Sequence, residues 1–406
     1  MLQEKKIRKN TVITIVSVAV FLLLMLVLEN TITATSRWSM LLACLRMSAV
    51  YALVAVSLNL LNGFTGLFSL GHAGFMLIGA YTYAVFTIPS NFRPMVYMYF
   101  EPAIQFSIPE VLQNIWGIPG MIMGVMIAIT IAGIITAAIG YLVGLPVLRL
   151  KGHYLSIATL GFAEIIRTIF LWGGFGPITN AANPLRLFVR LHSFVIDVGY
   201  ERYHYGLFLL MAISALCIFV MILLVTSSYG RAFKAIREDE IAAEAMGINL
   251  YKHKKISFTI SCFFTGVGGA LLAIFMGAAI AENFRIAMSY EVLLIVVLGG
   301  LGSISGSVIG AFLFIFASQW WLRGLDTGSF LGLQLELFRA GFRLVVFSVI
   351  LLLVILFFRR GIMGDRELPY YLSRWREQIP KLISRIVNFF KGKSKPKQGA
   401  ANVRYK

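Results

Sequence analysis

The sequence predicts an all-α fold, a polytopic bundle of transmembrane helices. Hydrophobic residues make up 59% of the 406 residues and charged residues only 13%, with a mean hydropathy of +0.83. A soluble domain carries about 25% charged residues, so this chain has too few polar side chains to coat a water-soluble body. Apolar runs of about 20 residues recur, and each is long enough to cross the bilayer as a helix with internally satisfied backbone groups.

Ten apolar runs are candidate spans. They are residues 11–28, 40–61, 64–88, 119–145, 153–172, 205–226, 256–280, 290–301, 303–321 and 341–358. The run 290–301 is short for a crossing, and the glycines at 299, 300, 302 and 306 interrupt the region, which favours a broken helix. We therefore expect ten crossings, or eight or nine with a re-entrant piece.

The placement of basic residues predicts the orientation. Lys and Arg precede the first span, follow the fourth at Arg149 and Lys151, fill the loop after the sixth, and recur in the tail. Basic residues near span ends are retained on the cytoplasmic side. Both termini are therefore expected in the cytoplasm, and the loops 29–39, 89–118, 173–204 and 322–340 on the other side.

We divide the chain into three parts: an N-terminal transmembrane helix (1–30), a membrane domain (31–362) and a basic cytoplasmic tail (363–406). The stretch 359–406 has 13 Lys or Arg against 3 Asp or Glu, so it carries +10 of the net charge of +18. Apolar and basic residues alternate over 370–390 in a pattern typical of a helix lying on the membrane surface. Because most other basic residues flank spans, lipid headgroups are the expected partner and nucleic acid is not.

The usual signatures of catalysis are missing. No Gly-x-x-x-x-Gly-Lys-Ser/Thr phosphate loop, His-Glu-x-x-His pair or Cys-x-x-Cys pair occurs. The five histidines are scattered, and Cys44, Cys217 and Cys262 lie in apolar stretches as small packing residues. We expect no catalytic residue, no metal ligand and no cofactor bound by this chain.

A charged island, residues 230–255, separates two apolar runs. Its pattern predicts a helix from about Arg231 to Gly247, which ends it in the left-handed conformation. Arg237 and Glu240 are three apart and are expected to pair. Apolar contacts come from Phe233, Ile236, Ala243 and Met246. The island is either an ordinary solvated loop or a helix that docks into a groove on a soluble partner.

Polar residues concentrate in the segment from Asn59 to Tyr81. Polar groups at membrane depth are costly unless they pair or line water, and glycines allow close approach or a helix break at a ligand site. The candidate pathway residues here are Asn59, Asn62, Ser69 and His72. The alternative is polar packing between helices, and a lone His72 is more often a hydrogen-bonded packing residue.

Two further stretches add candidate pathway residues. Glu164 and Arg167 are three apart inside an apolar run, where they either serve a pathway or form a structural ion pair. Residues 297–311 hold five glycines and three serines, including Ser303. Gly-Leu-Phe-Ser at 66–69 and Gly-Leu-Gly-Ser at 300–303 form a faint internal echo. A true repeat would oppose the two segments in space; the alternative is chance similarity, because glycine and serine are common in packed membrane helices.

These stretches together resemble the permease subunits of branched-chain amino-acid ABC importers, in particular the LivM type. The matching residues are 69–73 with 79–81, 154–167, 230–232 with 235–247, and 298–300 with 302–303. The stretch 235–247 is long and specific, and the resemblance covers about residues 40–362. One departure is the Thr-Asn-Ala-Ala-Asn-Pro sequence at 179–184, where the family has a pattern near Thr-Gly-Gly-x-x-Gly.

The resemblance implies a non-catalytic subunit of an ATP-driven importer in the bacterial cytoplasmic membrane. Its partners would be a second permease, two ATP-binding subunits that hydrolyse ATP, and a periplasmic or surface substrate-binding protein. The charged island would be the loop that contacts the ATPase. The residues carried over to that loop are Arg231, Arg237, Glu240, Ala243, Glu244 and Gly247.

Other functions remain open at this stage. A urea or short-chain amide importer permease shares these motifs. A secondary transporter or channel would need its own ion-coupling residues at depth, for which Glu164 and Arg167 are the candidates. An intramembrane enzyme is disfavoured because the catalytic patterns are missing.

Overall fold

The computed structural model describes residues 29, 39–150, 152–190, 195–198, 201–322, 342–357, 361–364 and 367. The chain divides into two units after Asp365, and all the described residues except Glu367 belong to the first. The predicted first span 11–28 and the predicted tail helix 370–390 lie outside the described residues. The division into three parts therefore stays a prediction, as does the side on which the termini lie.

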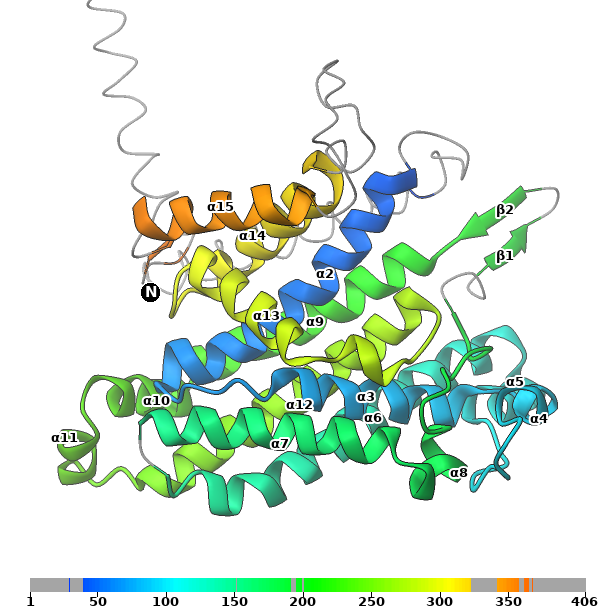
Figure 1. Ribbon diagram of the computed structural model, residues 1–406, viewed down its shortest axis with the longest axis horizontal. Helices are drawn as coiled ribbons and strands as arrows, with labels where there is room; N and C mark the ends of the chain where they lie inside the picture. The colour runs from blue at the N-terminus through cyan, green and yellow to red at the C-terminus, as the bar shows by residue number, and fades with distance from the viewer. Residues whose placement is uncertain are drawn as a thin grey trace, which may run out of the picture. The chain divides into compact units, whose positions relative to one another are not determined.

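The described part is a bundle of transmembrane-length helices (Figure 1), which confirms the all-helical fold class. Six helices are long and apolar enough to cross a membrane. They are α2 with its π-helical extension η1 (Ser39–Thr65), α6 (Ile118–Val147), α7 (His153–Leu171), α9 (Gly206–Thr226), α12 (Leu250–Met276) and α14 with its extension η6 (Ile304–Trp321). A seventh span results if α3 (His72–Thr87) is counted together with the segment Ser90–Val96, from which it is bent by 103°.

The predicted total of ten crossings also included two shorter helices, α13 (Ile286–Gly299) and α15 (Phe342–Phe357). One predicted boundary is wrong: the span 64–88 was expected to be continuous. Instead α2 continues to Thr65, residues 66–71 are not helical, and α3 begins at His72. Gly66 ends the first segment at φ 77°, a conformation that glycine adopts without steric penalty.

The core of the bundle is built from α2, α3 and α12, which are buried along most of their length. Small residues bring α3 and α12 together: a Cβ added at Gly79 would lie 2.0 Å from the carbonyl oxygen of Gly266. Helices associate in lipid largely through such close packing. In contrast, α7 and α9 keep exposed aliphatic side chains such as Ile157 and Leu223 along one face.

Short helices and long connections cover one end of the bundle. They are η2 (Ser90–Phe92), α4 (Arg93–Val96), α5 (Ile108–Trp116), η3 (Gly173–Phe175) and α8 (Gly176–Thr179). Buried Arg93 ties the first connection together by donating to the carbonyl oxygens of Val85, Ile104 and Phe106. The Asn180 side chain joins the two connections by donating to the Val96 carbonyl oxygen at 2.9 Å.

The sequence 179–184, where the chain departs from the family's glycine pattern, forms the turn after α8. Asn180 and Ala181 have φ of 60° and 51°, so two consecutive residues occupy the left-handed region without being glycine. Asparagine tolerates this conformation better than most residues. Its side-chain bond to Val96 holds the turn in place.

A short antiparallel hairpin, β1 (Val195–Val198) and β2 (Glu201–His204), precedes α9. The sequence analysis expected no strand. Three of the four residues of β1 are β-branched, which favours extended backbone. The hairpin lies in a connection between helices and leaves the helical class of the membrane domain unchanged.

Candidate coupling loop and polar clusters

The charged island forms two helices, α10 (Ser228–Glu238) and α11 (Glu240–Ala245), and not the single predicted helix. The break is at Asp239, whose backbone is extended at φ −158°, ψ 116°. Its side chain accepts hydrogen bonds from the N–H groups of Ile241 and Ala242 at 2.8 and 3.0 Å. Asp239 therefore acts as an N-cap, and a capping aspartate starts a new helix.

The end of α11 follows the prediction. Gly247 has φ 84°, and its N–H donates to the Glu244 carbonyl oxygen at 2.9 Å. The N–H of Ile248 donates to the Ala243 carbonyl oxygen at 3.1 Å. Together these bonds form a Schellman motif, which satisfies the last carbonyl groups of the helix.

One face of this loop is fixed to the membrane domain. Phe233 and Ile236 are buried, and the Arg237 guanidinium donates to the carbonyl oxygen of Gly63 at 2.8 Å. The predicted Arg237–Glu240 pair is wrong: Arg237 pairs with Glu238, and Glu240 pairs with Lys254 at 2.7 Å. Since Asp239 breaks the helix, residues 237 and 240 no longer share a helical face.

The opposite face of the loop is exposed. Ile241 and Met246 are each 82% exposed, the highest values among the large apolar side chains that the structure describes. The loop residues carried over from the resemblance divide between the two faces. Arg231, Glu240, Glu244 and Gly247 are exposed, Arg237 is half-buried and Ala243 is buried. The exposed position of Ile241 depends on the helix break, so the sequence pattern did not single it out.

Asn59 is fully buried and holds the break between α13 and α14. Its amide nitrogen donates to the Ser303 carbonyl oxygen at 2.9 Å and to the Ser307 hydroxyl at 2.7 Å. Its amide oxygen accepts from the Gly302 N–H at 2.9 Å. We call Asn59, Gly302, Ser303 and Ser307 the Asn59 clamp. It places residue 59 against the glycine-rich stretch, which is the opposition that a true repeat would give, and the repeat itself stays a prediction.

The break itself turns α13 and α14 into a tight antiparallel hairpin. A Cβ added at Gly299 would lie 2.3 Å from the Gly306 carbonyl oxygen, so the two backbones nearly touch. Ser303 caps α14 by accepting from the Gly306 N–H at 3.1 Å. The turn 361–364 closes the end of α13, because the N–H groups of Ile362 and Met363 donate to the carbonyl oxygens of Leu298 and Gly299.

The other polar candidates of the first segment make hydrogen bonds within the bundle. Asn62 accepts from the Ser69 N–H at 3.1 Å, and Ser69 is fully buried. His72 is buried, and its Nε2 lies 3.2 Å from the Ser261 hydroxyl, which donates to the Ser57 carbonyl oxygen. These bonds connect α3, α12 and α2. The pathway role of these residues stays a prediction beside the packing role.

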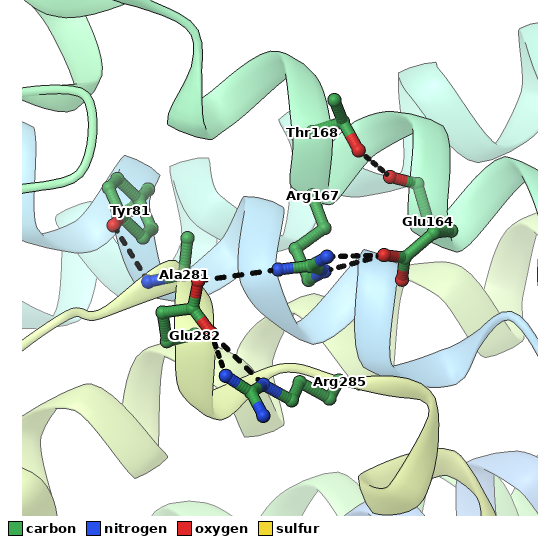
Figure 2. A network of polar contacts seen from close by, with 7 residues as sticks. All are labelled: Tyr81, Glu164, Arg167, Thr168, Ala281, Glu282 and Arg285. Carbon is green, nitrogen blue, oxygen red and sulfur yellow. Dashed lines mark hydrogen bonds and ion pairs between the residues drawn. The ribbon is translucent and has the colours of Figure 1, made fainter.

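Glu164 and Arg167 pair with each other and belong to a larger cluster (Figure 2). The Arg167 Nη1 also lies 3.6 Å from Glu282 Oε1, and Glu282 pairs with Arg285. We call these four residues the charged quartet. Its side chains are exposed by 37% at Glu164, 18% at Arg167, 46% at Glu282 and 67% at Arg285. The sequence pattern does not single out Glu282 and Arg285, which flank an apolar run in the position of ordinary loop charges.

The charged quartet lies within the length of a span. The 19-residue α7 is about 28 Å long, so Glu164 and Arg167 lie about 6 to 10 Å from its C-terminal end. The 14-residue α13 is about 9 Å too short to cross the hydrocarbon. The loop before it lies level with Arg167 inside α7, because Glu282 contacts Arg167. Non-helical backbone and charged side chains occur at this depth where they meet protein or water, and not where they meet lipid.

A further acidic residue at depth is Glu291 of α13. Its carboxylate accepts a hydrogen bond from the hydroxyl of buried Tyr51 at 3.4 Å. The sequence analysis did not select it, although a single carboxylate within the run 290–301 is the kind of residue that marks a functional site in a membrane.

Comparison with known families shows which family the chain belongs to. Residues 40–358 match the model of the family described as "branched-chain amino acid transport system / permease component". The chain belongs to this family. No solved structure gives a significant match.

Curated relatives agree with the family. The chain is 32% identical over 292 residues to the high-affinity branched-chain amino acid transport system permease protein LivM of Escherichia coli K12, covering 67% of this chain and 61% of that relative. It is 24% identical to the probable LivM of Methanocaldococcus jannaschii, over 66% of this chain and 76% of the relative. It is also 24% identical to E. coli LivH, over 79% and 93%. The chain thus spans about three fifths of the length of the E. coli LivM that it matches.

Proposed function

We propose that this chain is a permease subunit of an ATP-driven importer for branched-chain or related amino acids in the bacterial cytoplasmic membrane. The names of its relatives support the substrate class and the membrane role. ATP would be bound and hydrolysed by two partner subunits, and a substrate-binding protein would deliver the solute. Since this chain resembles both LivM and LivH, the second permease is a related chain.

The observation that carries the proposal is the two-faced coupling loop. Phe233, Ile236 and Arg237 fix α10 to the membrane domain, so a push on the loop is transmitted to the helices. Ile241 and Met246 leave a large apolar surface exposed on the other face. Burying each side chain in a partner would contribute about 1.5 to 3 kcal/mol. An ordinary solvated loop would gain nothing from this arrangement.

The translocation pathway runs along the face that carries the charged quartet. Its charges and the non-helical loop at membrane depth need water or a protein partner, and a solute pathway between two permeases supplies both. This assignment keeps Glu164 and Arg167 as pathway residues. Glu282 and Arg285 are added to them as pathway residues. The hydrogen bond between Asn59 and Ser303 would hold the α13–α14 hairpin beside the pathway.

The test is leucine uptake by the complete importer in proteoliposomes, with ATP inside and the binding protein outside. We expect Ile241→Asp to lower uptake at least tenfold, because losing about 1.4 kcal/mol of docking energy weakens association tenfold. Less ATPase should also co-purify with this variant. Lys252→Gln is the control, since Lys252 is an exposed residue on the first turn of α12 and lies outside the apolar surface.

Uptake of leucine by this chain alone, without nucleotide, would contradict the proposal and favour a secondary transporter. Uptake of urea but not leucine by the complete importer would keep the importer and change its solute. Unchanged leucine uptake with Ile241→Asp would remove the coupling role from α11.

A further inference from the structure

The charged quartet consists of two ion pairs on two separate walls. Glu164 and Arg167 form one pair on α7, where the Arg167 Nε donates to Glu164 Oε1 at 2.9 Å. Glu282 and Arg285 form the other pair at the start of α13, where the Arg285 Nε donates to Glu282 Oε2 at 3.0 Å. The two walls meet through the Arg167–Glu282 contact of 3.6 Å, which is too long for a good hydrogen bond (Figure 2).

The position of the second wall is fixed by a bond outside the quartet. The N–H of Ala281 donates to the hydroxyl of Tyr81 at 3.0 Å, and the Tyr81 ring packs edge-on against Phe170 of α7. The loop is therefore anchored to α3 next to Glu282. The exposed charges of Glu282 and Arg285 project from a held backbone, which is the condition for recognising a small solute.

We propose that the charged quartet binds the ammonium and carboxylate groups of a zwitterionic α-amino acid during transport, an inference that rests on the proposed importer function. The 3.6 Å contact between the walls opens, the solute carboxylate pairs with a guanidinium, and the solute ammonium pairs with a carboxylate of the quartet. No proton moves and no covalent bond changes. Two acidic and two basic side chains give a site of zero net charge, which remains zero when a zwitterion enters.

The exchange of ion pairs explains how such a site would distinguish a zwitterion from a solute with a single charge. A zwitterion replaces each broken contact with one of the same kind, so every charge keeps a partner. An amine or a carboxylic acid of the same shape supplies one charge, so it pairs with one side of the opened Arg167–Glu282 contact and leaves the other side without a solute partner. It also gives the occupied site a net charge of one, which the zwitterion does not. The site should therefore reject solutes with one charge and accept the zwitterion whatever its aliphatic side chain.

A protection experiment on the complete importer tests this site directly. Asn283 is exposed beside Glu282 and belongs to neither ion pair. Asn283→Cys is introduced after the three native cysteines have been replaced by alanine. The rate of modification by a charged methanethiosulfonate is then measured with L-leucine, with 3-methylbutylamine, which lacks the carboxylate, and with 4-methylpentanoate, which lacks the ammonium. We expect leucine at ten times its dissociation constant to slow modification by roughly tenfold, and both analogues to leave the rate unchanged.

Two variants complete the test. Arg285→Gln should abolish protection by leucine, and Arg186→Gln, another exposed arginine in a different segment, should retain it. No protection by leucine, or equal protection by either analogue, would overturn the site. Wild-type leucine uptake is measured in the same preparation. If uptake is present and protection is absent, the quartet proposal fails while the importer stands; if ATP-dependent leucine uptake is absent, the proposed function itself fails.

Discussion

The Asn59 clamp and the charged quartet lie at opposite ends of α13 and are built in opposite ways. The clamp is buried and combines an uncharged amide with backbone groups and hydroxyls. The hydrogen bonds of the Asn59 amide to Gly302, Ser303 and Ser307 are 2.7 to 2.9 Å long. The quartet is exposed, fully charged, and joined across its two walls at 3.6 Å. Buried polar groups are costly to leave unpaired, whereas exposed ion pairs exchange with little penalty. The clamp thus fixes the C-terminal end of α13, whereas the charged side chains at its N-terminal end are free to exchange ion-pair partners.

The largest expected effect is at the clamp. Asn59→Leu leaves the Gly302 N–H and the Ser307 hydroxyl without their amide partner inside the bundle. We expect a loss of about 3 kcal/mol in the free energy of unfolding, measured in mixed micelles. Ser307→Ala is the comparison variant, because it removes one hydrogen bond of the Asn59 amide and keeps those to Ser303 and Gly302, so it should lose less. Equal stability of Asn59→Leu and the wild type would mean that the clamp does not fix the hairpin.

A smaller effect is expected from the glycine that lets the clamp close. A Cβ added at Gly63 would lie 1.8 Å from the Asn59 amide oxygen and 2.4 Å from the Gly302 nitrogen. Gly63→Ala should destabilise the protein by about 2 kcal/mol, since overpacking against backbone forces a shift. Gly161→Ala is the control on α7, the helix of the quartet, where no neighbouring atom lies within 4 Å of the added Cβ. A loss of stability in both variants would show that the difference between the two ends is not steric.

The smallest effect on stability is expected at the quartet. Arg285→Gln removes the most exposed member of the cluster, and exposed ion pairs contribute about 0.2 to 1 kcal/mol. We expect the free energy of unfolding to fall by less than about 0.5 kcal/mol, while protection by leucine is lost. If Arg285→Gln lowered the free energy of unfolding as much as Asn59→Leu does, the quartet would be a structural element like the clamp.

The sequence was informative where a local rule decides the structure. Gly247 ends its helix as predicted, because glycine accepts the left-handed backbone and Ile248 completes the motif. Asp239 shows the limit of such rules. In a run of Glu, Asp and Glu it reads as one more solvated charge, and only its backbone conformation reveals the cap that divides the helix.

Contacts distant in sequence could be predicted only in part. The glycine-rich echo indicated that residues 59–81 and 297–311 would oppose each other, but not that the Asn59 amide would contact Gly302 and Ser303. Glu164 and Arg167 were selected because charges are rare inside a span. Glu282 and Arg285 were not, because the shortness of α13, which places their loop at depth, is visible only in the folded chain.

The turn 361–364 has a consequence for how the protein is made. The last carbonyl groups of α13 receive their hydrogen bonds from Ile362 and Met363, which are synthesised after α14 and α15. During translation the end of α13 therefore lacks these hydrogen bonds until α15 and the turn 361–364 have been synthesised. The α13–α14 hairpin is therefore completed late in synthesis, and a chain truncated before residue 362 would leave the Leu298 and Gly299 carbonyl groups without these partners.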